Sequence, residues 1–225
     1  PSGGRNPTCR AGRLEGNDVH RDMTEAAALL SPDFLVNIVL NHERNIAAVF
    51  AGHWEKAHIA ACETVAERFT VNIDRKADVI IVTPGGYPKD INYIQAHKAF
   101  DNCFSGVKPG GVVILAAECS EGIGSVSIKK WLQVPSLEEH ERLLREHFQI
   151  SGHTAMAHKL KNREVRTIMV TDLSDTDAKL LNVERARDLE HAVAMAEKHL
   201  HSFDPIVYIV PNGYTTLVKA KETLC

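Results

Sequence analysis

Two short apolar runs separated by a helical segment constrain the fold of this chain most strongly. Residues 77–83 (Ala-Asp-Val-Ile-Ile-Val-Thr) and 111–117 (Gly-Val-Val-Ile-Leu-Ala-Ala) are bounded by turn residues, the pattern of strands buried on both faces of a sheet. Between them, a helix pattern begins near Pro88 and ends near Cys103. This order predicts a right-handed β-α-β unit with parallel strands.

A glycine turn follows the first of these strands. Pro84, Gly85 and Gly86 come directly after it, and the two glycines allow positive φ angles or close approach of a ligand to the backbone. Ligands bind beyond the carboxyl ends of parallel strands, which is where this turn lies. Gln95 and Lys98 share one face in the amino-terminal half of the helix, where the helix dipole favours negative charge. An amide and an ammonium group there predict a site for a small anionic substrate, although a solvated surface is the open alternative.

The rest of the chain alternates between helix and strand patterns. We expect an α-β-β-α block in residues 1–75, with a helix at 18–30, hairpin strands at 34–40 and 46–51, and a helix at 53–69. A carboxyl-terminal α/β domain follows in residues 76–225, with later helices at 127–132, 136–147, 153–161 and 189–199, and strands at 165–170 and, finally, 206–210. The predicted fold class is α/β, with a Rossmann-like, mainly parallel sheet and flanking helices after the first block.

Composition argues against several classes of function. The net charge is −3 and the basic residues are scattered, so we expect neither nucleic acid nor a membrane as a partner. No apolar run approaches the roughly 20 residues that span a bilayer. The five cysteines form no C-x-x-C pair, which favours a reducing cytoplasm. Cys119 follows the second strand, but we interpret it as an ordinary free thiol rather than a nucleophile.

Several motifs together resemble the nickel-dependent lactate racemase family, specifically its carboxyl-terminal half. The most specific motif runs from Gly85-Gly86-Tyr87-Pro88 to Gln95 and Lys98. The supporting motifs, in chain order, are residues 17–23 (Asn-Asp-Val-His-Arg-Asp-Met), 34–40, 50–52 (Phe-Ala-Gly), 57–58 (Ala-His) and 209–213 (Ile-Val-Pro-Asn-Gly). The resemblance implies an isomerase: a racemase or epimerase of 2-hydroxy acids that acts by hydride transfer to a nickel-pincer nucleotide.

The resemblance also implies how the work of the active site is divided. This chain would supply substrate-binding residues, with Gln95 and Lys98 on the carboxylate and hydroxyl of the small 2-hydroxy acid, beside Gly85, Gly86 and Tyr87. The family's cofactor-tethering lysine, metal-binding histidine and acid/base histidines lie upstream of the matching segment, so no catalytic or metal-binding residue maps onto this chain. An upstream domain of the same protein would then bind most of the nucleotide. The chain begins with a linker-like stretch and no methionine, so we expect a fragment that is inactive alone.

Two departures from the family pattern bear on the substrate. Ile94 stands where a tyrosine usually precedes the glutamine, and Tyr93 lies one place earlier. His153 stands at the approximate position of a tryptophan that packs near lactate. A smaller, polar residue there favours a larger or more polar 2-hydroxy acid, such as a sugar acid.

The twelve histidines offer no metal site by their spacing. Pairs five residues apart or on opposite helix faces cannot share a metal, and the pairs in question are His53/His58, His153/His158 and His199/His201. We expect most histidines at the surface. His20 lies in a segment that resembles the family, and its expected role is helix capping or domain packing.

Other functions stay open as alternatives. A nicotinamide dehydrogenase is disfavoured because residues 84–86 (Pro-Gly-Gly) do not follow the G-x-G-x-x-G pattern. A non-catalytic binding or accessory α/β module, or a relative that keeps the fold without racemisation, would fit the same half of the protein.

Overall fold

The computed structural model describes residues 8–41, 43–200 and 203–221. The chain divides into two compact units, Pro1–Thr70 and Val71–Cys225. The division between these compact units falls at Thr70/Val71, slightly before the predicted domain boundary. The predicted domain bounds, 1–75 and 76–225, stay predictions. No helix in the described part of the chain has both the length and the apolar character needed to cross a bilayer.

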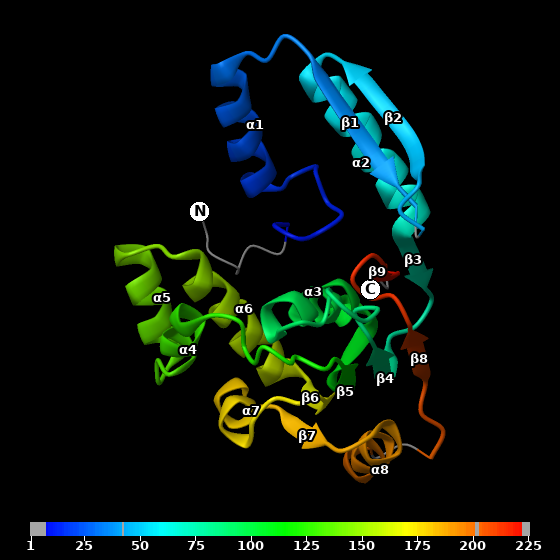
Figure 1. Ribbon diagram of the computed structural model, residues 1–225, viewed down its shortest axis with the longest axis vertical. Coiled ribbons are helices and arrows are strands. Elements are labelled where there is room, and N and C mark those ends of the chain that lie inside the picture. Colours follow the sequence, from blue (N-terminus) through cyan, green and yellow to red (C-terminus); the bar gives the residue numbers. More distant parts are fainter. Residues whose placement is uncertain (1–7, 42, 201–202, 222–225) are drawn as a thin grey trace. The chain divides into compact units, whose positions relative to one another are not determined.

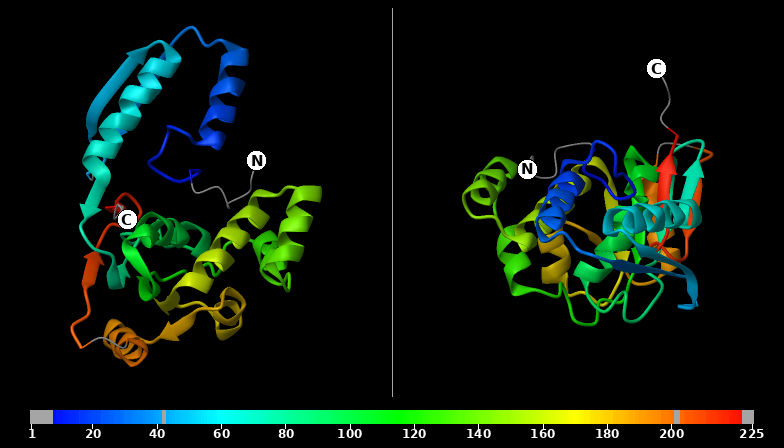
Figure 2. Two further views of the ribbon diagram at one scale, coloured as in Figure 1. Left: turned by 180° about the vertical axis from the view of Figure 1, so that it is seen from behind. Right: turned by 90° about the horizontal axis from the view of Figure 1, so that it is seen from above.

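In its described residues, the first unit contains two helices and a β-hairpin (Figure 1). Helix α1 (Asp18–Leu30) begins at Asn17, whose side chain accepts hydrogen bonds from the backbone of the next turn. Strands β1 (Leu35–Leu40) and β2 (Ile46–Gly52) pair antiparallel. Helix α2 (Trp54–Phe69) packs along both strands, as Figure 2 shows. The predicted α-β-β-α order is confirmed.

The second unit is built on a five-stranded parallel sheet in the order β7-β6-β5-β4-β8. Its strands are β4 (Ala77–Val82), β5 (Val107–Ala116), β6 (Arg166–Val170), β7 (Glu184–Ala186) and β8 (Val207–Val210). Strands β3 (Thr70–Ile73) and β9 (Leu217–Ala220) form a separate two-stranded sheet. The central pair β4 and β5 confirms the predicted β-α-β unit.

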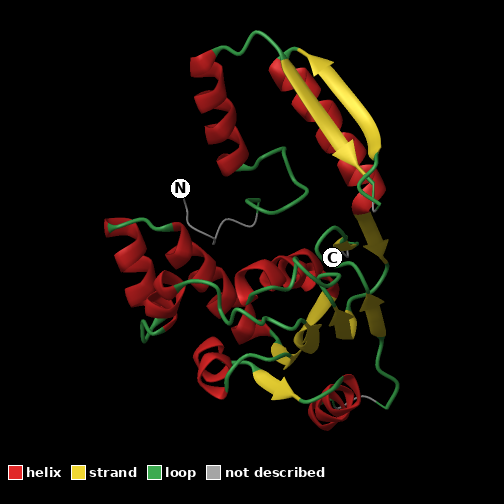
Figure 3. Ribbon diagram, in the orientation of Figure 1, coloured by secondary structure: helices red, strands yellow, loops and turns green. Residues whose placement is uncertain are grey.

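Helices lie on both faces of the five-stranded sheet (Figure 3), where α3 (Tyr93–Cys103), α6 (Ile150–Glu164) and α8 (Leu189–His199) contact its central strands. The other helices of this unit are α4 (Val126–Leu132) and α5 (Leu137–Glu146), which pack on α6, and α7 (Asp175–Leu181), which packs beside β7, with a short 3₁₀ turn at Phe104–Gly106. Successive residues of β5 point to opposite faces: Val113 joins the core on the α3 side, whereas Ile114 joins the core under α8. The α/β fold with flanking helices is therefore confirmed.

Helix α3 begins later than the sequence pattern predicts. The predicted start near Pro88 was wrong, because residues 85–92 form a loop and the helix begins at Tyr93, after the cap Asn92. The backbone carbonyls of Asp90 and Ile91 accept hydrogen bonds from the loop after β5, at 2.8 and 2.9 Å. Because these two carbonyls accept from another loop, they do not form the backbone hydrogen bonds of a helix.

Short elements account for the remaining differences. Helix α7 and strand β7 were not predicted, and the strand expected at 206–210 is not the final one because β9 follows it. Helix α6 runs over Ile150–Glu164, longer than the predicted 153–161. The helix predicted at 189–199 matches α8. His42 and His201 lie outside the described residues.

Candidate functional site

The loops that leave β4 and β8 are joined at the carboxyl edge of the sheet. Thr83, just after β4, donates its N–H to Val210 (3.2 Å) and accepts at its carbonyl from Gly213 (2.8 Å). Gly213 is buried, and an added Cβ would collide with Val82 of β4 and lie 3.0 Å from Ala99 of α3. A glycine is therefore required for the β8 loop to pack between strand and helix.

The glycine turn after β4 has the backbone form that its sequence predicts. Gly85 and Gly86 have φ angles of +98° and +73°, which side chains rarely tolerate. A Cβ on Gly85 would lie 2.9 Å from Oδ1 of Asn212 and 3.4 Å from Nζ of Lys89. Glycine at this position thus leaves room for two polar side chains, one from each exit loop.

Gln95 and Lys98 of α3 contact each other beside this turn. The Lys98 ammonium donates to Oε1 of Gln95 at 2.8 Å and to the hydroxyl of Tyr214 at 3.2 Å. Its Nζ also lies 5.2 Å from the centre of the Tyr214 ring, within the range of a cation–π contact. Gln95 is half-buried and Lys98 is exposed, so both have polar hydrogens left for a ligand at the surface.

Helix α3 and the β8 loop are held together by a second set of hydrogen bonds. The side-chain amide of Asn102 donates to the carbonyls of Gly213 and Tyr214, each at 3.0 Å. At the other end of the helix, Asn92 accepts at Oδ1 from the N–H of Gln95 at 3.1 Å. These bonds fix the relative positions of Gln95, Lys98 and Tyr214.

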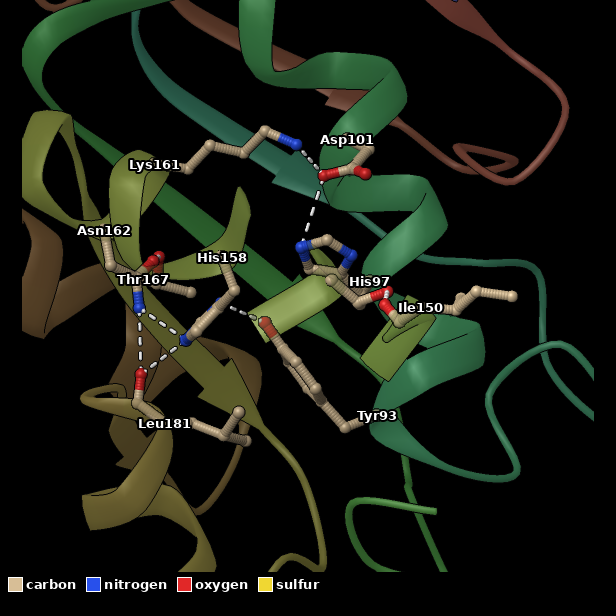
Figure 4. Close-up of polar contacts among 10 residues, drawn as sticks. Tyr93, His97, Asp101, Ile150, His158, Lys161, Asn162, Thr167 and Leu181 are labelled. Atoms are coloured by element: carbon tan, nitrogen blue, oxygen red, sulfur yellow. Dashed lines mark hydrogen bonds and ion pairs between the residues drawn. The ribbon is translucent and has the colours of Figure 1, made fainter. Parts of the chain in front are cut away.

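A buried polar network ties the inner face of α3 to α6 and α7 (Figure 4). The Tyr93 hydroxyl lies 2.5 Å from Nδ1 of His158, and His158 Nε2 lies 2.6 Å from the Leu181 carbonyl. A carbonyl only accepts, so Nε2 carries the proton and Nδ1 accepts from Tyr93. Burial lowers the pKa of His158 to about 3 and raises the pKa of Tyr93, so both groups are neutral at pH 7.

A second buried histidine lies next to this network. Burial lowers the pKa of His97 to about 4, although Asp101 acts in the opposite direction. His97 Nε2 lies 3.3 Å from Oδ1 of Asp101 without forming a hydrogen bond, and Lys161 pairs with the same carboxylate (Figure 4). His97, His158 and also His140 are buried. These three are exceptions to the expected surface position of most histidines: His140 and His158 bond to backbone carbonyls of neighbouring segments, whereas Nε2 of His97 has no hydrogen-bond partner.

The structure does not join two of the predicted site residues to Gln95 and Lys98. His153 is exposed on α6, and Tyr87 is 78% exposed in the loop after Gly86. In the described part of the chain, no hydrogen bond, ion pair or ring contact links either of them to Gln95 or Lys98. Their roles stay predictions.

The described residues show neither a metal-binding cluster nor a reactive thiol at Cys119. Within the ranges that the structure describes, no three His, Cys, Asp or Glu side chains converge to hold a metal ion. Cys119 is a free, buried thiol, and burial raises its pKa to about 11. A thiol in this state is a poor nucleophile, which agrees with its predicted ordinary role.

Three polar residues near the glycine turn were not predicted as site residues. Lys89 and Asn212 lie beside Gly85, and Tyr214 contacts both Lys89 and Lys98. Residues 209–213 did contribute to the family resemblance. Asn212 and Tyr214 lie close to the glycine turn because β8 pairs with β4. The spacing of apolar runs in the sequence does not give the order of strands in the sheet.

Comparisons with known proteins agree with this architecture. Residues 73–218 match the family described as the lactate racemase C-terminal domain. The chain is 34% identical over 230 residues to a lactate racemase of Thermoanaerobacterium thermosaccharolyticum, an alignment that covers 96% of this chain and 52% of that protein. It is 39% identical over 119 residues to a lactate racemase of Lactiplantibacillus plantarum, covering 52% of this chain and 28% of that protein.

Solved structures give the same result. The lactate racemase apoprotein of Thermoanaerobacterium thermosaccharolyticum matches with a TM-score of 0.89 and 33% identity, over 96% of this chain and 53% of that one. A Thermotoga maritima protein shares the fold, with a TM-score of 0.63 and 18% identity over 91% and 54% of the two chains. The chain thus spans about half the length, or less, of the relatives it matches. With residues 73–218 as its carboxyl-terminal domain, the chain belongs to the lactate racemase family.

Proposed function

We propose that this chain is the carboxyl-terminal portion of a longer racemase or epimerase of 2-hydroxy acids, and that Gln95 and Lys98 bind the substrate. Membership of the lactate racemase family supports the reaction class. The position of Lys98 supports the proposed binding site, because its ammonium is oriented by Gln95 and Tyr214 at the carboxyl edge of the sheet. Among the described residues it has no carboxylate partner, so a substrate carboxylate can take that place.

The hydrogen-bonding capacity of the pair fits a 2-hydroxy acid. Lys98 uses two of its donors on Gln95 and Tyr214, which leaves one for a substrate carboxylate. Oε1 of Gln95 already accepts from Lys98, and its amide nitrogen only donates, so the free part of this side chain suits an anion better than a cation. A hydrogen bond to a charged group contributes about 1.5–3 kcal/mol, and the exposure of Lys98 places its contribution at the low end.

The other predicted site residues are proposed to surround the substrate. Gly85 and Gly86 let the substrate approach the backbone, since neither carries a Cβ at the mouth of the turn. Tyr87, exposed in the same loop, would contact the substrate from the side. His153 is proposed from the family resemblance alone, as a polar replacement for an apolar wall.

The implied nickel-pincer nucleotide does not fit the residues that the structure describes. The described residues offer no cluster of three metal-binding side chains, so we assign them no part in holding nickel. We propose that the remainder of the longer protein binds the nucleotide and that this portion alone is inactive. The free thiols of Cys62, Cys103 and Cys119 support a reducing, cytoplasmic setting.

Racemisation by the longer protein tests the proposed function. The protein, supplied with its nickel cofactor, is incubated with single enantiomers of lactate, malate and gluconate, and optical rotation is followed. We expect rotation to change toward an equilibrium value with at least one acid, through inversion of the hydroxyl-bearing carbon. If no acid in a broader panel of 2-hydroxy acids is converted, the racemase proposal is wrong and a non-catalytic binding module takes its place.

A further inference from the structure

A second ammonium group lies beside the same tyrosine that orients Lys98. Lys89 Nζ is 5.8 Å from the centre of the Tyr214 ring, and Lys98 Nζ is 5.2 Å from it. Lys89 belongs to the loop after β4, whereas Lys98 belongs to α3. Two separate elements of the chain therefore bring positive charge to one aromatic side chain.

The positive charge of the two lysines is not balanced by nearby acids. In the part of the chain that the structure describes, neither Lys89 nor Lys98 forms an ion pair. Asp90, adjacent to Lys89 in sequence, forms no ion pair with it among the described residues, and its backbone carbonyl accepts from the N–H of Cys119 in the loop after β5. Like charges that share a small region repel each other, and the Tyr214 ring offsets only part of this cost. A bound anion would remove it.

The neutral side chain of Asn212 lies on the same side of Gly85 as the Lys89 ammonium. Oδ1 of Asn212 and Nζ of Lys89 both lie next to the position where a Cβ of Gly85 would be, at 2.9 and 3.4 Å. Lys89 is half-buried, so its ammonium is less free to move than that of an exposed lysine. The absence of a side chain at Gly85 thus leaves space beside this ammonium.

We infer that Lys89 binds a second carboxylate of the substrate, so that the substrate of this protein is a 2-hydroxy dicarboxylic acid. The inference rests on the proposed function, in which Gln95 and Lys98 hold the carboxylate next to the hydroxyl-bearing carbon. An ammonium-to-carboxylate hydrogen bond is roughly 2.8 Å long. Because Lys89 and Lys98 both lie beside the Tyr214 ring, a small diacid that binds Lys98 through one carboxylate places its other carboxylate near Lys89.

Binding to the chain of 225 residues tests this inference. The ¹⁵N-labelled chain is titrated with malate, a four-carbon hydroxy diacid, and with lactate, its monocarboxylate counterpart, and amide shifts give the two dissociation constants. We expect malate to bind more tightly than lactate. Lys89→Met should weaken malate binding about fivefold, the size of one exposed ion pair, and leave lactate binding unchanged.

Two further variants separate this inference from the proposed function. Lys98→Met should weaken both acids, whereas Lys198→Met, which removes an exposed lysine from the last turn of α8, should affect neither. Unchanged malate binding in Lys89→Met, together with weakened binding of both acids in Lys98→Met, would overturn the inference and leave the proposed function standing. If the wild-type chain binds neither acid, or Lys98→Met binds both as the wild type does, both proposals are wrong.

Discussion

Lys98 donates to Oε1 of Gln95 across 2.8 Å, from one turn further along α3. The same ammonium reaches Tyr214, in the loop after β8, at 3.2 Å. This contact links two segments that are far apart in sequence and orients both side chains at the carboxyl edge of the sheet. Residues held in place before a substrate arrives lose less conformational freedom on binding.

Replacing Gln95 by glutamate should abolish the anion preference of the pair. A carboxylate three residues before Lys98 would form an ion pair with it and repel a substrate carboxylate. We expect 2-hydroxy acids to bind about tenfold more weakly to Gln95→Glu, as measured by amide-shift titration. Gln133→Glu, which adds the same charge at an exposed position after α4, should bind as the wild type does. Equal binding by both variants would show that Gln95 does not face the substrate.

Asn102 should contribute to stability through the β8 loop. Its amide satisfies the carbonyls of Gly213 and Tyr214, and Asn102→Ala removes both hydrogen bonds. We expect the free energy of unfolding in urea to fall by about 1–2 kcal/mol. Asn72→Ala, at an exposed position of β3, serves as the control and should cost less than about 0.5 kcal/mol. A similar loss in the two variants would argue against an anchoring role for Asn102.

The buried hydroxyl of Tyr93 should matter more than an exposed one. Tyr93→Phe leaves Nδ1 of His158 without its donor, and an unsatisfied buried acceptor costs about 1–3 kcal/mol. Tyr208 offers a matched control, since its hydroxyl donates to the Arg75 carbonyl near the surface. Urea unfolding should show a loss below about 0.5 kcal/mol for Tyr208→Phe. The prediction fails if Tyr93→Phe is as stable as the wild type.

Acid should destabilise the fold because His97 and His158 are buried in the neutral form. Their pKa values are lowered from 6.5 to about 4 and about 3, so at pH 5 the unfolded chain binds protons that the folded chain does not. Their stabilising effect is complete above pH 6.5 and is lost as the pH falls toward 4 and then 3. Each histidine should contribute a slope approaching about 1.4 kcal/mol per pH unit.

Urea unfolding at pH 7.5, 5.5 and 4.5 measures this loss. Carboxylates are partly protonated at pH 4.5 in every variant, so the difference between the wild type and a histidine variant measures the contribution of that histidine. His97→Gln should flatten the dependence, whereas His153→Gln, at an exposed position, should leave it as in the wild type. A wild-type stability that is constant between pH 7.5 and 4.5 would contradict the neutral, buried histidines.

Sequence patterns predicted the sheet better than they predicted the site. Strands β4 and β5 were identified because β-branched runs buried on both faces have few other structures available. The start of α3 was misplaced because Pro88 is a common first helical residue, whereas the preceding loop bonds to the β5 exit loop instead. The cap Asn92 was the better local signal.

Contacts between distant segments set the limit on predicting the site. Gln95 and Lys98 were identified because helix geometry places them on one face. Tyr214 was missed because its approach depends on β8 lying next to β4, which no local pattern encodes. The burial of His158 was not predicted for a similar reason, since its partner Tyr93 lies 65 residues away in sequence.

Titration of the ¹⁵N-labelled chain with single-enantiomer lactate and malate measures whether Gln95 and Lys98 bind the substrate carboxylate. We predict saturable shifts in the amides of the glycine turn, the start of α3 and the β8 loop, and their loss in a folded Lys98→Met variant. Saturable shifts that persist unchanged in Lys98→Met, or shifts confined to other parts of the chain, would show that Gln95 and Lys98 do not bind the substrate carboxylate.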